Sequence, residues 1–435
     1  MAATAEQAPL AGADQEAPRI ASPSGLRLLR SRGRARGIVA LLGPAFVAAV
    51  AYVDPGNFGT NFAAGARFGY ALAWAVVTAN LMAMLVQYLS AKTGVATGRD
   101  LPQLCREHFG RKASLGLWAQ AELIAMATDV AEFVGAALGL NLLFGVPLFA
   151  AGLITAVVAF GILALQQRGY RRFELAIAGL LGIVFLGFAY DLAGVGASAS
   201  GIAAGLVPGL GGGSEELLLV SGIIGATVMP HVIYLHSALT KSRVTCQDDD
   251  ERRELLRFQR LDVVVALGAA GLINLAMLFV AAAVFHRTGG SPVDSIEAAH
   301  AGLARLVGGG AALSFAVALL ASGLSSSSVG TYAGQVVMQG FIRRRIPLFA
   351  RRGLTMLPAL LVLGLGLPAV SCLVISQVVL SFGIPFAVVP LVLLTRRRDI
   401  MGPLVNRRLT TAAAGCIAAV IIVLNVFLLV STFAR

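Results

Sequence analysis

Two polar interruptions in otherwise apolar helical runs constrain this chain more than any other feature of its sequence. Asp54-Pro55-Gly56-Asn57 lies in the middle of the first long apolar run, and Ala226-Thr227-Val228-Met229-Pro230-His231 lies in the middle of the sixth. Proline lacks an N–H and glycine loosens the backbone, so we expect each motif to unwind its helix. Unwound backbone at membrane depth is tolerated only where protein buries it or where it lines a cavity. The two motifs therefore predict a binding site at the midplane of a membrane protein.

The composition agrees with a membrane protein. Of 435 residues, 57% are hydrophobic and 13% are charged, and the mean hydropathy is +0.81. A formal charge of +12 would suit nucleic-acid binding, but the basic residues gather in short segments between apolar runs, which argues against it. Residues 1–36 lack the apolar core of a cleavable signal peptide and predict a disordered, basic cytoplasmic tail. Residues 37–435 are then the transporter domain.

The apolar runs predict eleven membrane-spanning helices, since each span needs about 20 residues. Their approximate bounds are 38–64, 70–91, 115–141, 146–166, 173–192, 216–240, 259–285, 311–340, 353–369, 372–394 and 409–432. Basic residues concentrate in the tail and in every second connection, so 30 of the 34 lie on one side of this arrangement. The other side has only Arg67, Arg287, Arg305 and Arg435. The positive-inside rule then places the N-terminus in the cytoplasm and the C-terminus outside.

The helix count suggests an internal repeat. Helices one to five (about 38–192) and six to ten (about 216–394) form two blocks, and each block opens with an interrupted helix. Because five is odd, the second block enters the membrane from the opposite side. Inverted repeats with broken first helices are typical of the LeuT-like fold. We therefore predict an all-α polytopic membrane protein of this fold, with helix eleven (about 409–432) outside the repeat.

The first interruption carries an oxygen-rich pair. Asp54 and Asn57 are three residues apart and share a helical face if the turn is only partly unwound. An ionised carboxylate within an apolar span costs at least ~2.5–3.5 kcal/mol, so Asp54 needs a cation, a partner or a proton. The alternative is a helix-capping turn at the membrane interface, which the long apolar stretch before Asp54 disfavours.

The second interruption adds a softer ligand. Met229 would be core filler in an ordinary apolar helix, but its place at a matching break favours a ligand. Pro230 cannot donate to the carbonyl of Ala226, which frees that oxygen for a cation. Gln377, within the tenth apolar run, can supply an amide oxygen to an occluded ion. A thioether beside oxygen ligands suits Mn²⁺ and Fe²⁺ better than Ca²⁺ or Mg²⁺.

Three carboxylates on the third helix predict a proton relay. Glu122, Asp129 and Glu132 are spaced seven and three residues apart and share one face. Such a face is a poor lipid surface, so it predicts proton transfer, structural ion pairing, or both. Arg351 and Arg352, at the start of the ninth helix, are candidate partners.

Two further groups of polar residues are ambiguous. His231 lies at the second break, where it can accept a proton near neutral pH or serve as a hydrogen-bonded gate residue. His231 and His236 do not form a His-Glu-x-x-His zinc motif. Ser325 to Ser328, with Thr331, are compatible with a Na⁺-binding stripe, but helix packing is the favoured interpretation.

These motifs resemble the Nramp family (natural resistance-associated macrophage protein) of metal-ion:proton symporters. The resemblance rests on the two breaks, on Thr128 to Phe133 and on Gly330 to Gln335, and it runs from about Gly43 to the end of the chain. It implies a metal site of Asp54, Asn57, the Ala226 carbonyl, Met229 and, in an occluded state, Gln377. It also implies a proton pathway through Asp54, Glu122, Asp129, Glu132, His231, Arg351 and Arg352. The presence of Met229 favours the Mn²⁺/Fe²⁺ branch over the branches that carry Mg²⁺ or Al³⁺.

The sequence thus predicts a bacterial-type, proton-coupled importer of Mn²⁺ and Fe²⁺ in the plasma membrane, working by alternating access. Its partners would be divalent metal ions, protons and the lipid bilayer, with no nucleic acid, no obligate protein partner and no resident cofactor. One alternative is a Na⁺-coupled symporter of organic solutes on the same fold, which Asp54 disfavours. The other is a membrane-embedded metalloenzyme, which would need His-rich coordination and an open water site.

Overall fold

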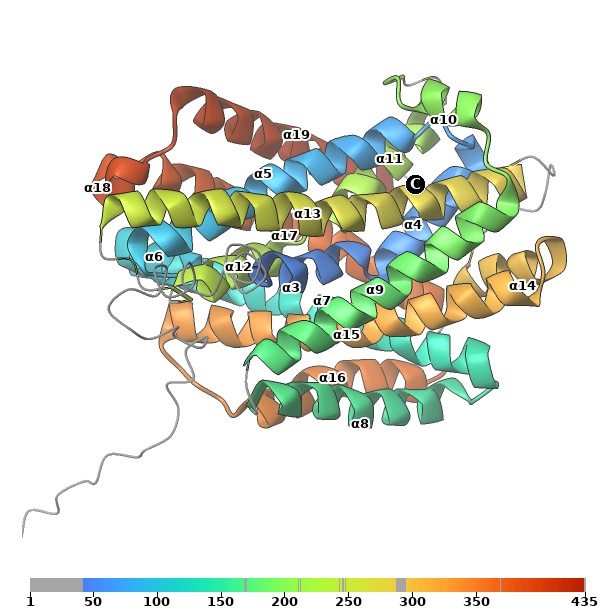
Figure 1. Ribbon diagram of the computed structural model, residues 1–435. Helices are drawn as coiled ribbons and strands as arrows, with labels where there is room; N and C mark the ends of the chain where they lie inside the picture. Colours follow the sequence, from blue (N-terminus) through green and yellow to red (C-terminus); the bar gives the residue numbers. More distant parts are fainter. Residues whose placement is uncertain are drawn as a thin grey trace, which may run out of the picture.

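The computed structural model describes residues 42–433 except 168–169, 210, 212, 242, 245, 247, 287–294 and 368. The predicted tail over residues 1–36 lies outside the described residues. Within them the chain forms an all-helical bundle whose long helices run between two ends (Figure 1). α6, α18 and the start of α13 lie at the left end of that view, and α10 and α14 lie at the right end.

The helices follow one another without an intervening strand in the described part of the chain. In order they are α3 (Pro44–Val50), η1 (Ala51–Val53), α4 (Pro55–Phe68), α5 (Ala73–Thr97), α6 (Leu101–His108), α7 (Arg111–Phe144), α8 (Leu148–Gln167), α9 (Tyr170–Val195), α10 (Ala199–Gly205), α11 (Gly213–Thr227), α12 (Pro230–Lys241), α13 (Asp249–Ala281), η2 (Ala282–His286), α14 (Ile296–Leu306), α15 (Gly309–Ile342), α16 (Leu348–Gly364), α17 (Ala369–Thr395), α18 (Arg398–Met401), η3 (Gly402–Leu404) and α19 (Arg408–Phe433).

The predicted all-α membrane architecture is confirmed. Nine helices of the described chain are long and apolar enough to span a membrane, with α11 and α12 counted as one. The first and ninth predicted spans fall short of that length for different reasons. The first is divided into α3–η1 and α4, and the ninth, α16, has only 17 residues.

The first interruption breaks its helix by capping. Asp54 has extended backbone angles (φ −82°, ψ 170°), and its Oδ1 accepts a hydrogen bond from Asn57 N at 2.9 Å. Pro55 follows at the first helical position, where a missing N–H costs nothing. A short 3₁₀ turn, η1, precedes the break. The cap and the proline together end one helix and begin the next.

The second interruption breaks its helix through proline. α11 ends at Thr227 and α12 begins at Pro230, so Val228 and Met229 join the two halves. Val228 N still donates to Ile224 O at 3.0 Å. Pro230 has no N–H to donate to Ala226 O, four residues back, so the helical ladder ends there.

Several predicted boundaries differ from the structure. α13 begins at Asp249 rather than near 259, because Asp248 caps it through a 2.8 Å bond from Glu251 N to its carboxylate. Its charged first turns are amphipathic rather than apolar, so the hydropathy pattern did not reveal them. The short helices α6, α10, α14 and α18 lie in segments predicted as connections.

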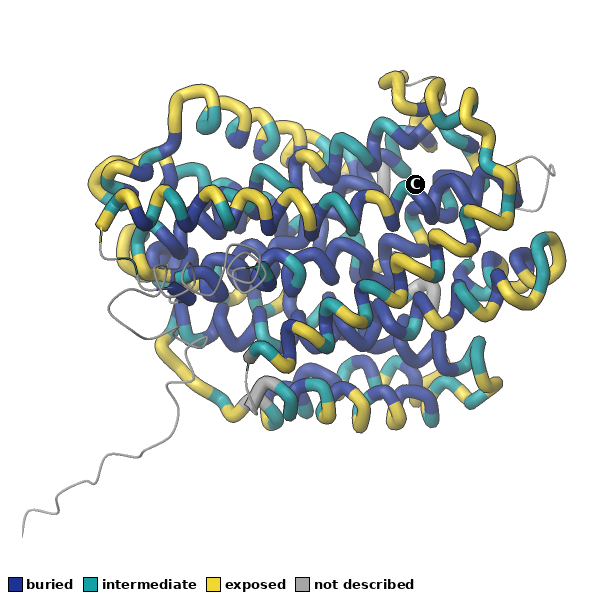
Figure 2. Tube along the Cα trace, in the orientation of Figure 1, coloured by how far each residue is buried: buried dark blue, intermediate teal, exposed yellow. Residues whose placement is uncertain are grey.

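Burial follows the pattern of a membrane bundle. The inner helices are buried, whereas exposed residues concentrate at the two ends and on the outer faces (Figure 2). Those outer faces are apolar: Val157 on α8 is 73% exposed, Leu186 on α9 is 69% exposed, and Val423 on α19 is 65% exposed. Large exposed apolar surfaces of this kind fit contact with lipid.

Candidate metal site and proton pathway

Asp54 is the centre of the first break and is fully buried. One carboxylate oxygen caps α4, as described above, and the other accepts a hydrogen bond from Gln377 Nε2 at 3.3 Å. Gln377 belongs to α17, and Gly56 makes its approach possible. A Cβ on Gly56 would lie 1.8 Å from Gln377 Nε2. The structure therefore brings Asp54 and Gln377 together, although 323 residues separate them in sequence.

Two amide oxygens beside this carboxylate have no hydrogen-bond partner among the described residues. Asn57 Oδ1 and Gln377 Oε1 are both buried and unsatisfied. An unpaired buried acceptor is costly, whereas a cation would satisfy two acceptors and a carboxylate at once. The first break is therefore rich in acceptors and poor in donors, as a cation site requires.

The carbonyls freed by the break accept hydrogen bonds from Asn57 and from two residues that the sequence analysis did not single out, Asn274 and Ser322. Tyr52 O accepts hydrogen bonds from Asn57 Nδ2 and from Asn274 Nδ2, the latter at 2.8 Å, and Val53 O accepts one from Ser322 Oγ. Asn274 lies on α13 and also accepts from Asn61 Nδ2 at 2.9 Å. The only sequence signal for Asn274 is an amide within an apolar run.

The second break is buried to the same degree. Ala226 and Met229 are both fully inaccessible, and α11 packs against η1 and α4 of the first break. Thr227 Oγ1 donates to Ile223 O at 2.6 Å. The Ala226 carbonyl receives no helical hydrogen bond from position 230, because Pro230 has no N–H. The two breaks thus share the interior of the bundle.

The predicted ligand set contains a single charged group. Among the described residues no three His, Cys, Asp or Glu side chains gather closely enough to hold a metal ion. The predicted set has one carboxylate, two amides, one carbonyl and one thioether. A single charged ligand suits an ion that must enter and leave better than an ion held permanently.

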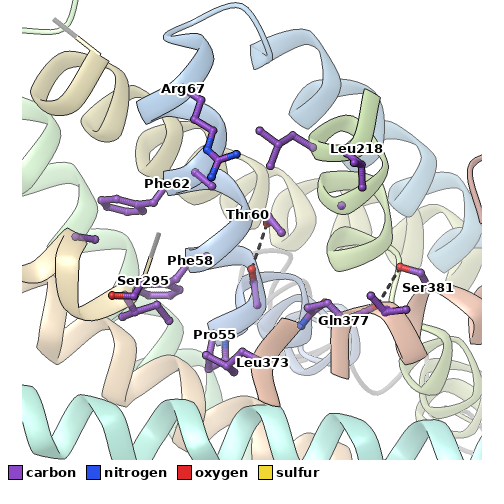
Figure 3. A pocket seen from close by; sticks show the side chains of 18 of the residues that line it. Pro55, Phe58, Thr60, Phe62, Arg67, Leu218, Ser295, Leu373, Gln377 and Ser381 are labelled. Carbon is purple, nitrogen blue, oxygen red and sulfur yellow. Dashed lines mark hydrogen bonds between the residues drawn. The ribbon is translucent and has the colours of Figure 1, made fainter. Parts of the chain in front are cut away.

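A cavity of about 410 Å³ reaches the first break from the α10 and α14 end (Figure 3). Arg67, Phe62, Thr60 and Phe58 line it along α4, down to Pro55, and Gln377 faces them from α17. Its walls also include residues from α11, α14 and α19: Leu218, Leu219, Gly222, Ile296, Ala299 and Leu428. The cavity therefore connects the candidate metal site with one end of the bundle.

The N-terminal end of α3, away from the first break, is held by buried charged residues. Asp262 on α13 accepts from the backbone N–H groups of Gly43 and Ala45 at 3.2 and 2.9 Å. Glu174 on α9 pairs with Arg243, which follows α12: Nη1 contacts Oε1, and Nη2 lies 3.1 Å from Oε2. Both charges are buried. We call Asp262, Glu174 and Arg243 the α3 latch.

The three carboxylates of the third predicted span lie on α7 and meet the two predicted arginines. Glu122 Oε1 pairs with Arg351 Nη2 at 2.5 Å, and Asp129 Oδ1 pairs with Arg352 Nη1 at 3.2 Å. We call Glu122, Asp129 and Glu132 the carboxylate row. The exposed fraction of the side chain falls along it, from 21% for Glu122 to 2% for Asp129. Glu132 is fully buried, and within the described part of the chain neither of its carboxylate oxygens has a hydrogen-bond partner.

Glycines on α15 make room for this row. A Cβ on Gly330 would lie 2.8 Å from Glu132 Oε2 and 3.2 Å from Asp129 Oδ1. One turn further, a Cβ on Gly334 would lie 2.2 Å from Arg351 Nη2. At the other end of the row, Gly135 on α7 packs directly on Pro55. The row therefore begins at the first break and runs about 15 Å along α7, at 1.5 Å per residue from Glu132 to Glu122.

The two histidines of α12 face different partners. His231 Nδ1 lies 3.5 Å from Thr128 Oγ1 on α7, next to Asp129, and its Nε2 has no partner. His236 Nδ1 lies 2.8 Å from Gln87 Oε1, and Gln87 Nε2 donates to Tyr52 Oη at 2.6 Å. His231 therefore contacts α7 at Thr128, next to Asp129 in sequence, whereas His236 joins a network with Gln87 and Tyr52 that the sequence analysis missed.

The serine stripe of α15 is engaged in packing and ion pairing. Ser325, Ser326 and Ser328 each donate to a carbonyl of their own helix. Ser327 Oγ and Thr331 Oγ1 instead accept from Arg352, at 2.5 and 2.9 Å. These contacts support the packing interpretation of the stripe.

The fold and the paired breaks define a multi-pass membrane transporter with discontinuous helices. The chain belongs to the Nramp family: the family model described as natural resistance-associated macrophage protein-like matches residues 45–431. It is 50% identical over 398 residues to a divalent metal cation transporter of Bacillus subtilis, covering 92% of this chain and 93% of that protein. It is 52% identical over 403 residues to a divalent metal cation transporter of Deinococcus radiodurans, covering 91% and 90%.

Solved structures agree with this assignment. The manganese transporter of Eremococcus coleocola, in complex with an aromatic bis-isothiourea substituted compound, superposes with a TM-score of 0.83 at 34% identity, covering 90% of this chain and 86% of that one. Mhp1, a nucleobase-cation-symport-1 family transporter, superposes with a TM-score of 0.57 at 16% identity, covering 90% and 93%, which is a likeness of fold alone. The predicted family and LeuT-like fold are confirmed.

Proposed function

We propose that this protein imports Mn²⁺ and Fe²⁺ across the bacterial plasma membrane together with protons. The observation that carries the proposal is the buried Asp54 carboxylate, at a helix break, with the unpaired oxygens of Asn57 and Gln377 beside it. The relatives named as divalent metal cation transporters and the manganese transporter structure support the substrate class.

The ligands are Asp54, Asn57, Gln377, the Ala226 carbonyl and Met229. Hard carboxylate, amide and carbonyl oxygens suit Mn²⁺ and Fe²⁺, and a softer thioether adds a preference for these ions over Ca²⁺ and Mg²⁺. The membrane potential favours entry of a divalent ion by about 4.6 kcal/mol per 100 mV, at about 2.3 kcal/mol per charge.

Protons move along the row on α7. Glu132 lies within electrostatic range of both Asp54 and Asp129, so a cation on Asp54 changes the field at the first member of the row. Arg352 and Arg351 balance the charge of Asp129 and Glu122 while a proton passes. His231, beside Thr128, is positioned to exchange a proton between the metal site and the row. Asp54 is both a metal ligand and a member of the proton pathway.

The direction of transport follows from charge and from the cavity. The basic segments lie at the α6, α18 and α13 end, which the positive-inside rule assigns to the cytoplasm. The cavity then opens to the outside, and the α3 latch closes the cytoplasmic end. Import proceeds by alternating access, as the half-helices of the two breaks move around the site.

The decisive experiment is uptake into proteoliposomes, with Mn²⁺ measured by an internal fluorophore and protons by a pH-sensitive dye. Asp54→Asn should abolish both signals, because no other carboxylate lies at the breaks. Asp191→Asn is the matched control, since Asp191 on α9 is also a buried carboxylate without a hydrogen-bond partner in the described structure. Near-normal Mn²⁺ uptake by Asp54→Asn would contradict the site.

A further inference from the structure

Lys92 is a buried cation that neither the metal site nor the proton row uses. It lies on α5, less than two turns from the helix end at Thr97, and is 7% exposed. Its ammonium donates to Asn406 Oδ1 at 2.7 Å. A buried ammonium with only one neutral acceptor is costly unless an anion compensates it.

Asn406 holds that acceptor in place. Its backbone N–H donates to Thr395 O at 3.1 Å, and its Nδ2 donates to Thr395 Oγ1 at 2.9 Å. It lies in the short connection between η3 and α19, directly before Arg407. The same fixed connection therefore presents an acceptor to Lys92 and a second cation beside it.

Two further cations border Lys92. Arg260 contacts Tyr88, one helical turn before Lys92 on α5, and Arg407 directly follows Asn406, the partner of Lys92. The Arg260 guanidinium lies over the Tyr88 ring, 5.2 Å from its centre, and donates to Tyr88 Oη at 3.4 Å. In the described part of the chain none of these three cations forms an ion pair with a carboxylate. Other basic residues at this end do pair, such as Lys241 with Asp100 at 2.8 Å.

The surface around this cluster is apolar. On α13, Leu261, Val264 and Val265 follow Arg260 and are 43%, 50% and 44% exposed. On α19, Leu409 follows Arg407 by two residues and is 82% exposed. Convergent cations bordered by outward apolar side chains match the level of lipid headgroups at the cytoplasmic face.

We propose that Lys92, Arg260 and Arg407 bind the phosphate of an anionic phospholipid of the cytoplasmic leaflet. The two guanidinium groups donate to the phosphate oxygens, and Lys92 supplies the buried charge beneath them. The acyl chains lie along the exposed apolar residues of α13 and α19. A free phosphate ion offers the same oxygens, but it gains nothing from that apolar border.

The test is native mass spectrometry of the full chain in neutral detergent, with phosphatidylglycerol and phosphatidylethanolamine added separately. Wild type should retain phosphatidylglycerol in preference to phosphatidylethanolamine. Arg260→Gln and Arg407→Gln should each lower its retention by about fivefold, which corresponds to the roughly 1 kcal/mol that one basic side chain contributes near an anionic surface. Arg344→Gln, an exposed arginine of the α15–α16 connection, removes the same charge and should leave retention unchanged.

Thermal unfolding gives a second readout that separates a lipid site from a purely structural role. Lys92→Gln keeps a donor for Asn406, so its melting temperature without lipid should equal or exceed that of wild type. Added phosphatidylglycerol should stabilise wild type and Arg344→Gln but not Lys92→Gln. Equal retention in wild type and the cluster variants would overturn the proposal. So would stabilisation by inorganic phosphate alone, which would assign the cluster to a free anion.

Discussion

At the scale of a single residue, Asp54 caps a helix and is also the central ligand of the proposed metal site. Its Oδ1 caps α4 through Asn57 N, and its other oxygen faces Gln377. The sequence analysis treated capping and metal binding as alternatives, but the structure shows the cap in the buried interior of the bundle. The cap therefore creates the break that exposes the remaining oxygen to a cation.

Substitution of Asp54 can separate these roles. Asp54→Asn keeps an acceptor for Asn57 N, so stability should change little while Mn²⁺ binding is lost. Asp54→Ala should lose binding and also about 1 kcal/mol of stability with the cap. Calorimetric titration with Mn²⁺ and thermal unfolding in detergent would measure the two effects. Equal melting temperatures for both variants would show that the cap contributes nothing.

Met229 should control selectivity more than rate. It is the only soft atom in the proposed ligand set, and hard ions such as Ca²⁺ gain nothing from it. Met229→Ala should leave oxygen and water ligands, which discriminate poorly between Mn²⁺ and Ca²⁺. Excess Ca²⁺ should then compete with Mn²⁺ uptake by the variant, and Cd²⁺ uptake should fall most. Met82→Ala, at a buried methionine of α5, is the control. Unchanged discrimination would make Met229 core filler.

Asp129 should affect protons rather than metal. Its carboxylate faces Arg352, not the breaks, and Arg352 retains its contacts with Ser327 and Thr331 when the charge is removed. Asp129→Asn should therefore bind Mn²⁺ within a few-fold of wild type. Proton entry should fall by about 10²-fold, as when a positioned proton-transfer group is lost. If Mn²⁺ affinity fell as far as in Asp54→Asn, α7 would belong to the metal site.

At the scale of elements, α7 and α15 pack closely because glycine lines their contact, and the glycines differ in what they face. A Cβ on Gly323 would lie 2.7 Å from the backbone nitrogen of Ala136, which cannot move alone. A Cβ on Gly330 would meet the flexible end of Glu132 instead. The same substitution therefore has different consequences at positions seven residues apart.

Gly323→Ala should destabilise the bundle by about 1–3 kcal/mol, the usual cost of overpacking. Gly330→Ala should change stability little but displace the Glu132 carboxylate and slow proton entry. Gly116→Ala on α7 meets open space and serves as the control. Melting temperatures together with dye-measured proton flux would test the pair. Normal proton flux in Gly330→Ala would remove Glu132 from the pathway.

The elements also show how far sequence alone could reach. The breaks were predictable because Pro55 and Pro230 each remove a backbone N–H from the helical hydrogen bonds, whatever residues surround them. Arg351 and Arg352 could be predicted as partners of the α7 carboxylates, because buried charges need opposite charges, but which arginine pairs with which carboxylate could not. Asn274, Gln87 and Ser322 were not, because a polar residue in an apolar run indicates that it has a partner but not which one. The charged start of α13 was missed because it lies outside the apolar span.

At the scale of the whole molecule, the two ends of the bundle are in different states. One end has a cavity that reaches Pro55 and Gln377, whereas at the other end α3 is buried and held by the latch. A site reached from one side only is what alternating access requires at each stage. In the proposed mechanism, the free energy of the α3 latch therefore sets how often the latched end opens.

Breaking the α3 latch should shift the population toward that opening. Arg243→Gln removes the buried arginine partner of Glu174 and leaves Arg171 as its remaining partner, 2.9 Å away. The cost in the closed state is therefore below the about 3–5 kcal/mol of a fully broken buried pair, and it falls further once water enters. A cysteine at Ala48, buried on α3, in a background without the four native cysteines, reports access of a thiol reagent from the cytoplasmic side. Labelling should accelerate at least about tenfold, since 1.4 kcal/mol of differential stability already gives that factor.

Arg253→Gln is the control: it breaks an exposed pair with Asp250 on α13 and should leave labelling unchanged. If Arg243→Gln and Arg253→Gln were labelled at the wild-type rate, the latch would only stabilise the fold and would not control opening.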